Sequence, residues 1–203
     1  MSKNRAPNRP IVAPKFHHTT FTTLRLDDMV AWYCNVAGLT PVYHGESAAW
    51  LTNDEANHRI AFLSPPGLKN PVDKPHTIGL HHTAFEYADF DAWMYNYVRL
   101  RDSGIVPFLT LDHGMTISLY YADPEGNGVE IQVDTFGDWS KSKEWMSGSL
   151  EFAEDQLGAH FDPDKLVEAW QAGLSFEEIH RRTRAGEYAP AVIPTDIFLP
   201  EVY

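Results

Sequence analysis

The sequence has almost no cysteine and no long apolar run. Its single cysteine, Cys34, has no partner within the chain for an internal disulfide. No stretch approaches the roughly 20 consecutive apolar residues of a membrane-spanning helix, and the opening MSKNRAPNRPIVAPK has prolines where a signal peptide has its apolar core. We therefore expect a cytoplasmic protein with no membrane partner.

Basic residues are also scarce. The chain has 16 Lys and Arg against 28 Asp and Glu, a net charge of −12. This balance disfavours binding to a nucleic-acid backbone or to an anionic surface, so we expect no nucleic-acid partner. With 43% hydrophobic residues, the 203 residues are sufficient for one substantial core.

The order of expected elements occurs twice. FHHTTFTT at 16–23 and GLHHTAFEY at 79–87 both contain HHT-x-F. A helical pattern follows each and stops at a glycine, Gly38 or Gly104, and three strand-like segments come next. We interpret this as two tandem βαβββ modules, at about 15–66 and 78–136, separated by a linker rich in Pro, Gly and Lys.

The two ends of the chain differ from the repeat. Residues 1–14 are rich in proline and predict an N-terminal arm. Beyond about 137, FDPDKLVEAWQ has a proline in its first turn, and SFEEIHRRT has Ser175 and Glu178 at capping-box spacing. We predict that 137–203 is a helical and irregular extension, packed on the duplicated unit or on a partner subunit.

Strand alternation decides which histidine of each pair faces a pocket. The large aromatic residues share the face of the first histidine: Phe21 that of His17, and Phe85 and Tyr87 that of His81. If these aromatics pack under the helices, His17 and His81 take structural positions near the helix layer. His18 and His82 then point to the concave side.

A carboxylate falls on the matching face of the last strand. In GVEIQVD, Val129 and Ile131 belong to the apolar face and Glu130 to the other. A lone strand histidine or glutamate is more often simply solvated, but the repeat and the shared face favour a common role for His18, His82 and Glu130. Two imidazoles and one carboxylate form the facial triad that binds Fe(II) and leaves positions open for substrate and oxygen.

The repeated unit, the HHTTF and HHTAF starts and the segment YYADPEGNGVEIQ together resemble the vicinal oxygen chelate superfamily. Residues 16–135 are similar to single-domain type I extradiol dioxygenases of the 2,3-dihydroxybiphenyl kind. The resemblance implies an α+β fold in which 15–136 forms a partly open, metal-holding β-barrel. It also implies Fe(II), or Mn(II), held by His18, His82 and Glu130.

The same resemblance implies the remaining site residues. Tyr120, ten residues before the glutamate, matches a tyrosine that donates a hydrogen bond to a bound catecholate. His58 of NHRIAF matches a catalytic histidine, and an imidazole with a pKa of about 6.5 can accept and return a catechol proton at neutral pH. A solvated loop histidine is the alternative. A further family histidine falls near Leu111, which indicates His113 as a pocket residue.

The expected function is ring opening of a catechol beside its hydroxyls with O2, in aromatic degradation, by a homo-oligomer. Two alternatives stay open. A non-redox metalloenzyme such as a fosfomycin-resistance transferase would use a similar triad but needs cations, and the candidates are Arg59, Lys69 and Lys74. A metal-free binding protein of the bleomycin-resistance type would leave the three candidate ligands without a role.

Overall fold

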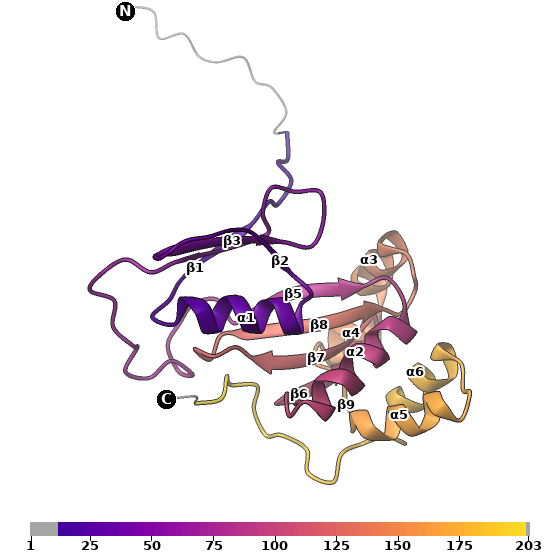
Figure 1. The fold of residues 1–203 in the computed structure, drawn as a ribbon. Coiled ribbons are helices and arrows are strands. Elements are labelled where there is room, and N and C mark those ends of the chain that lie inside the picture. Colours follow the sequence, from indigo (N-terminus) through magenta and orange to yellow (C-terminus); the bar gives the residue numbers. More distant parts are fainter. Residues whose placement is uncertain (1–11, 202–203) are drawn as a thin grey trace, which may run out of the picture.

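The computed structural model describes residues 12–201, so most of the expected N-terminal arm lies outside the described residues. The first module contains β1 (Thr19–Thr22), α1 (Leu26–Val36), β2 (Thr40–His44), β3 (Ala48–Thr52) and β4 (Ile60–Leu63). The second contains β5 (His82–Tyr87), α2 (Phe90–Asp102), β6 (Leu109–Asp112), β7 (Thr116–Ala122) and β8 (Gly128–Asp134). The predicted α+β fold of two βαβββ modules is confirmed (Figure 1).

Each module forms its own sheet with the same strand order. The first sheet runs β1-β4-β3-β2 and the second β5-β8-β7-β6, with β9 (Ala159–His160) added at the β6 edge. In both, the first and last strands of the module pair in parallel and the others are antiparallel. Over 12–201 the two sheets do not join into a closed barrel, which agrees with a partly open arrangement (Figure 1).

Capping residues explain the start of α2 and the C-terminal ends of both module helices. The Asp89 carboxylate accepts a hydrogen bond from the Ala92 amide at the start of α2. Gly38 and Gly104 follow α1 and α2 with φ of 65° and 85°, the left-handed conformation that terminates helices. Within 12–201, no helix is both long enough and apolar enough to cross a membrane.

One buried core joins the two modules. It contains Tyr33 of α1 and Trp93 of α2, together with Phe62 and Ile131 from the two sheets. The Tyr33 hydroxyl donates to Asp123 at 3.2 Å across the module boundary, and within the second module the Trp93 indole N–H donates to the Ile131 carbonyl at 2.9 Å. The helices therefore cover one face of each sheet and leave the other for the site.

The extension packs on the second module of its own chain. It contains α3 (Trp139–Gly148), α4 (Leu150–Glu154), β9, α5 (Pro163–Gln171) and α6 (Phe176–Arg184). The two helices predicted here are present, and the Ser175 hydroxyl accepts from the Glu178 amide at 3.3 Å, as capping spacing requires. Phe161, Leu166 and Ile179 extend the shared core.

Candidate active site

Four polar side chains form a connected chain on the open face of the second sheet. The strand register places Glu130 of β8 directly beside Tyr120 of β7. His82 Nε2 lies 3.0 Å from Glu130 Oε2, and the Tyr120 hydroxyl donates to Glu130 Oε1 at 2.9 Å. His113 Nε2 lies 2.8 Å from the Tyr120 hydroxyl. The structure thus brings together four of the six predicted site residues.

Glu130 is kept ionised inside this chain. Only 6% of the residue is exposed, and burial alone would raise its pKa. The neighbouring His82, and then Ser118 and Tyr120, together outweigh burial and hold the pKa of Glu130 below its ordinary value. Burial, and then the Glu130 charge, raise the pKa of Tyr120, so its hydroxyl stays protonated. Since this hydroxyl donates to Glu130, its oxygen accepts from His113.

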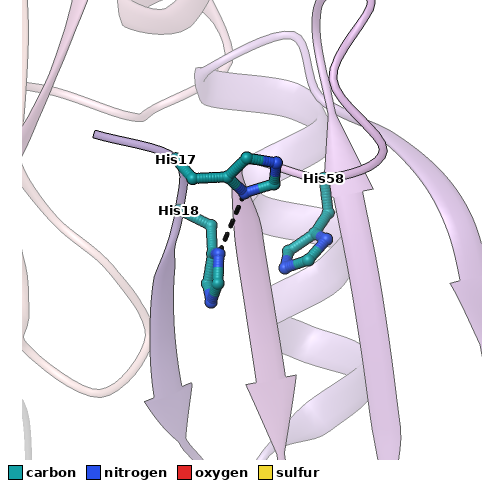
Figure 2. A group of neighbouring side chains, drawn as sticks. All are labelled: His17, His18 and His58. Carbon is teal, nitrogen blue, oxygen red and sulfur yellow. Dashed lines mark hydrogen bonds between the residues drawn. The ribbon is translucent and has the colours of Figure 1, made fainter. Parts of the chain in front are cut away.

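The other two predicted residues, His18 and His58, lie in the first module (Figure 2). Together with His17 they offer ring nitrogens that all lie within 4.8 Å of one another, the one such group found among residues 12–201. His17 Nδ1 is 3.0 Å from His18 Nδ1, and the rings of His18 and His58 are 4.3 Å apart at their centroids. His18 therefore does not share a ligand group with His82 and Glu130 in this structure.

Arg59 fixes the segment that carries His58. Its guanidinium donates to both carboxylate oxygens of Asp54 and, at 2.9 Å, to the His17 carbonyl. His58 lies in the loop before β4, two residues ahead of its first residue, Ile60. Burial, and then the neighbouring His18 and His17, lower the pKa of His58, which favours the neutral imidazole that can accept a proton.

The expected packing of His17 and His81 under the helices is wrong. β1 begins at Thr19 and β5 at His82, so both residues precede the regular strands, where alternation no longer fixes their direction. His17 is exposed, and His81 turns its Nε2 toward the Ile197 carbonyl at 2.8 Å. Within the strands alternation holds, because Phe21 is buried in the core.

An open cavity of about 510 Å³ lies over Glu130. One wall is the second sheet, with Tyr120 and His113. The extension supplies the other wall: Trp139, Ser142, Lys143 and Met146 of α3, and Phe152 of α4. The Trp139 indole N–H donates to Glu86 of β5 at 2.7 Å, which anchors α3 on the sheet.

The predictions from the sequence missed these extension residues. Because α3 lies outside the repeat, comparison of the two modules could not reveal it. One signal was available: residues 139, 142, 143 and 146 have the i, i+3, i+4, i+7 spacing of one helix face.

Residues 15–131, more than half of the chain, match the model of the Glyoxalase/Bleomycin resistance protein/Dioxygenase superfamily. The chain belongs to this superfamily. Over 174 residues it is 40% identical to biphenyl-2,3-diol 1,2-dioxygenase 3 of Rhodococcus globerulus, covering 86% of this chain and 91% of the relative. It is 36% identical to biphenyl-2,3-diol 1,2-dioxygenase 2 of the same organism, and the match covers 87% of this chain and 92% of the relative. The predicted family is confirmed.

Solved structures of the superfamily agree on the fold. A glyoxalase/dioxygenase from Nostoc punctiforme is 17% identical with a TM-score of 0.51, covering 62% of this chain and 97% of that chain. A domain of the same superfamily from Frankia sp. EAN1pec is 16% identical with a TM-score of 0.50, and the match covers 61% of this chain and 99% of that chain. The two Rhodococcus matches are longer than the two modules, so those relatives share part of the extension as well.

Proposed function

We propose that this protein is an extradiol dioxygenase, which uses O2 to open the ring of a catechol at a bond beside its two hydroxyls. A 2,3-dihydroxybiphenyl-like catechol from aromatic degradation is the proposed substrate. The supporting observation is the buried, ionised Glu130 at the floor of a 510 Å³ cavity, within the size range of small-molecule sites. The named dioxygenase relatives, at 36% and 40% identity, support the reaction class.

The donor set fits a divalent metal ion. Two ligands about 2.1 Å from one ion, at right angles to each other, are about 3.0 Å apart. His82 Nε2 and Glu130 Oε2 have a separation of 3.0 Å. Imidazoles with a single carboxylate are the ligands of non-haem Fe(II) oxygenases. We assign Fe(II), with Mn(II) as a second ion the set accepts, to His18, His82 and Glu130; when bound, it supplies Lewis acidity and redox chemistry toward O2.

His18 is assigned to this centre and not to the cluster with His17 and His58. Three imidazoles provide no negative charge for a divalent cation, whereas the buried carboxylate of Glu130 requires a positive partner. Thr20, Phe21 and Thr22 of β1 line a cavity of about 690 Å³ together with His81. The beginnings of β1 and β5 therefore border a common space. The assignment requires that His18 rotate away from His17 and toward His82 and Glu130, neither of which lines this cavity.

The side chains around the cavity bind the catechol and move its protons. The Tyr120 hydroxyl is held protonated by burial; when substrate is bound it would turn its one hydrogen from Glu130 to a catecholate oxygen, and His113 orients it by donating to its oxygen. His58 does not line this cavity in the structure; we assign it the proton transfer because its neutral imidazole can accept a proton from a catechol hydroxyl and return it when the ring opens. Trp139 and Phe152 contact the ring substituent and exclude water from it.

Two of the three cations named for the transferase alternative are bound to other groups of the chain. Arg59 donates to the Asp54 carboxylate. Lys74 Nζ donates to the Glu125 carbonyl at 2.9 Å and to the Asn127 side-chain oxygen at 2.6 Å. Arg59, Lys69 and Lys74 do not line the cavity over Glu130, but Lys143 of α3 does, so the dioxygenase relatives and not a lack of cations favour the dioxygenase.

The ring-opening reaction itself tests the proposal. Metal-free protein is loaded with Fe(II) without air, mixed with 2,3-dihydroxybiphenyl and then exposed to air. We expect a yellow ring-opened product and one O2 consumed per catechol, with loss of activity on chelation and recovery with Fe(II). Neither product nor O2 uptake across several catechols, or full activity in Glu130→Ala, would contradict it.

We also propose that the protein assembles with copies of itself. β2 forms an edge of the first sheet, and all five of its residues are exposed, including Val42 and Tyr43. Exposed apolar edge strands are commonly covered by another chain. Light scattering after size-exclusion chromatography should give a multiple of 23.0 kDa, and a mass of one chain would contradict this assembly.

A further inference from the structure

The end of the extension packs against the start of β5. Leu199 is buried, and its Cδ2 lies so near Gly128 that a Cβ there would be only 3.0 Å away. The ring of Phe198 lies 4.6 Å from that of His76 in the linker, measured between centroids. Between these contacts, the Ile197 carbonyl meets His81 Nε2 at 2.8 Å. Segment 197–199 therefore lies beside the residue that precedes His82.

Hydrogen-bond chemistry fixes the protons along this contact. A carbonyl oxygen can only accept, so His81 Nε2 carries a proton and donates to Ile197. In the neutral imidazole Nδ1 then has the lone pair, and it lies 2.8 Å from His82 Nδ1. His82 Nδ1–H donates to it. The Glu130 carboxylate can also only accept, so in the metal-free protein His82 Nε2 carries a proton that it donates to Glu130 at 3.0 Å. A metal ion bound at Nε2 would take the place of this proton, while Nδ1–H still donates to His81.

We propose that the Ile197 carbonyl and His81 form a relay that sets the tautomer and orientation of His82 as a metal ligand. Ligating histidines are commonly oriented by the bond that their other nitrogen makes. The proposal rests on the metal centre of the proposed function. His81 is a positioning residue, because it acts through His82 and has no contact with Glu130. The end of the extension thereby supports the site from outside the repeat.

The repeat supplies an internal comparison. In the first module His17 Nδ1 lies 3.0 Å from His18 Nδ1, the same contact as in the second. His17 is exposed, however, and no hydrogen bond of its Nε2 is found within residues 12–201. His17 can therefore adopt either tautomer, whereas His81 is held in one. We therefore expect substitution of His81 to lower the metal affinity more than substitution of His17.

Mn(II) binding to metal-free protein, measured from the EPR signal of the free ion, tests the relay without activity. We expect His81→Ala to lower the affinity about 10- to 100-fold. His81→Gln, whose amide can donate to Ile197 and accept from His82, should retain most of the affinity. His17→Ala should cause a smaller loss than His81→Ala.

Two truncations test whether segment 197–199 supports metal binding. Removing residues 197–203 should lower the Mn(II) affinity as much as His81→Ala does. Combining the truncation with His81→Ala should lower it little further, because both changes break the same contact between Ile197, His81 and His82. Removing only 200–203, which keeps Ile197 and Leu199, should leave the affinity unchanged. Circular dichroism reports whether each variant folds; if the longer truncation does not fold, the comparison of His81→Ala with His81→Gln decides.

The outcomes separate the relay from the metal centre. If His82→Ala abolishes binding but His81→Ala binds as wild type does, the relay is wrong and the metal centre stands. The relay is also wrong if a folded variant lacking 197–203 binds Mn(II) with wild-type affinity. It is likewise wrong if His81→Gln lowers the Mn(II) affinity as much as His81→Ala does. If the wild-type protein does not bind Mn(II), both the relay and the proposed centre are overturned.

Discussion

Two adjacent tyrosines give the sharpest test of the hydrogen-bond chain at Glu130. Tyr120 is 5% exposed, and its hydroxyl donates to the buried carboxylate at 2.9 Å. Tyr121 is 1% exposed and lies on the opposite, core face of β7, where its hydroxyl has no hydrogen-bond partner among the described residues. Each Tyr→Phe substitution removes one buried hydroxyl, but only Tyr120→Phe removes a bond to a charged group.

Tyr120→Phe and Tyr121→Phe should change the free energy of unfolding by different amounts. A hydrogen bond to a charged group contributes about 1.5–3 kcal/mol, and Glu130 stays buried after the substitution. Tyr120→Phe should therefore lower the free energy of unfolding by about 1.5–3 kcal/mol. Tyr121→Phe should leave it unchanged or raise it, because an unpaired buried hydroxyl is removed.

Urea unfolding of the metal-free variants at pH 7, followed by circular dichroism, measures both changes. If the two variants differ by less than about 0.5 kcal/mol, the Tyr120 hydroxyl does not make the charge-assisted bond assigned to it. In the Fe(II)-loaded enzyme, Tyr120→Phe should also lower kcat/KM for the catechol, whereas Tyr121→Phe should not.

Three further predictions concern the cavity, the loop before β4 and the core. Trp139→Ala removes a cavity wall and the bond to Glu86, so KM should rise more for 2,3-dihydroxybiphenyl than for catechol; equal rises would contradict the placement of α3. The Asp54 carboxyl should titrate by NMR at about 2 because Arg59 holds it ionised, and Arg59→Met should move the midpoint toward 3.8. Because the folded pKa is depressed, the Asp54 contribution to stability is present above pH 3.8 and is lost as pH falls toward 2; a wild-type midpoint near 3.8 would refute this. Trp93→Ala empties a fully buried site and should cost about 3–5 kcal/mol in urea unfolding, and a loss below about 1 kcal/mol would be inconsistent with a shared core.

Local periodicity was sufficient to predict the elements and several side-chain directions. Alternation in GVEIQVD placed Glu130 opposite Val129 and Ile131, and β8 has this arrangement. The glycines that end α1 and α2, and Ser175 at the start of α6, were likewise recognisable, because caps depend on a few neighbouring residues.

Features that depend on packing between distant segments could not be predicted. His17 and His81 lie just outside their strands, so their directions follow from neighbours such as Ile197, more than 100 residues away. The wall formed by α3 has no counterpart in the repeat. The distance between His18 and His82 depends on how the two modules pack, which no local pattern specifies.

The location of the bound metal tests the central assignment most directly, because His18 lies with His17 and His58 in the structure but is assigned to a centre with His82 and Glu130. Crystals of the Fe(II)-loaded protein, grown without air, would show the ion by anomalous scattering at the iron edge. We expect an iron peak between His82 Nε2 and the Glu130 carboxylate, with His18 as the third protein ligand. An iron peak among His17, His18 and His58, with none at Glu130, would contradict the assignment.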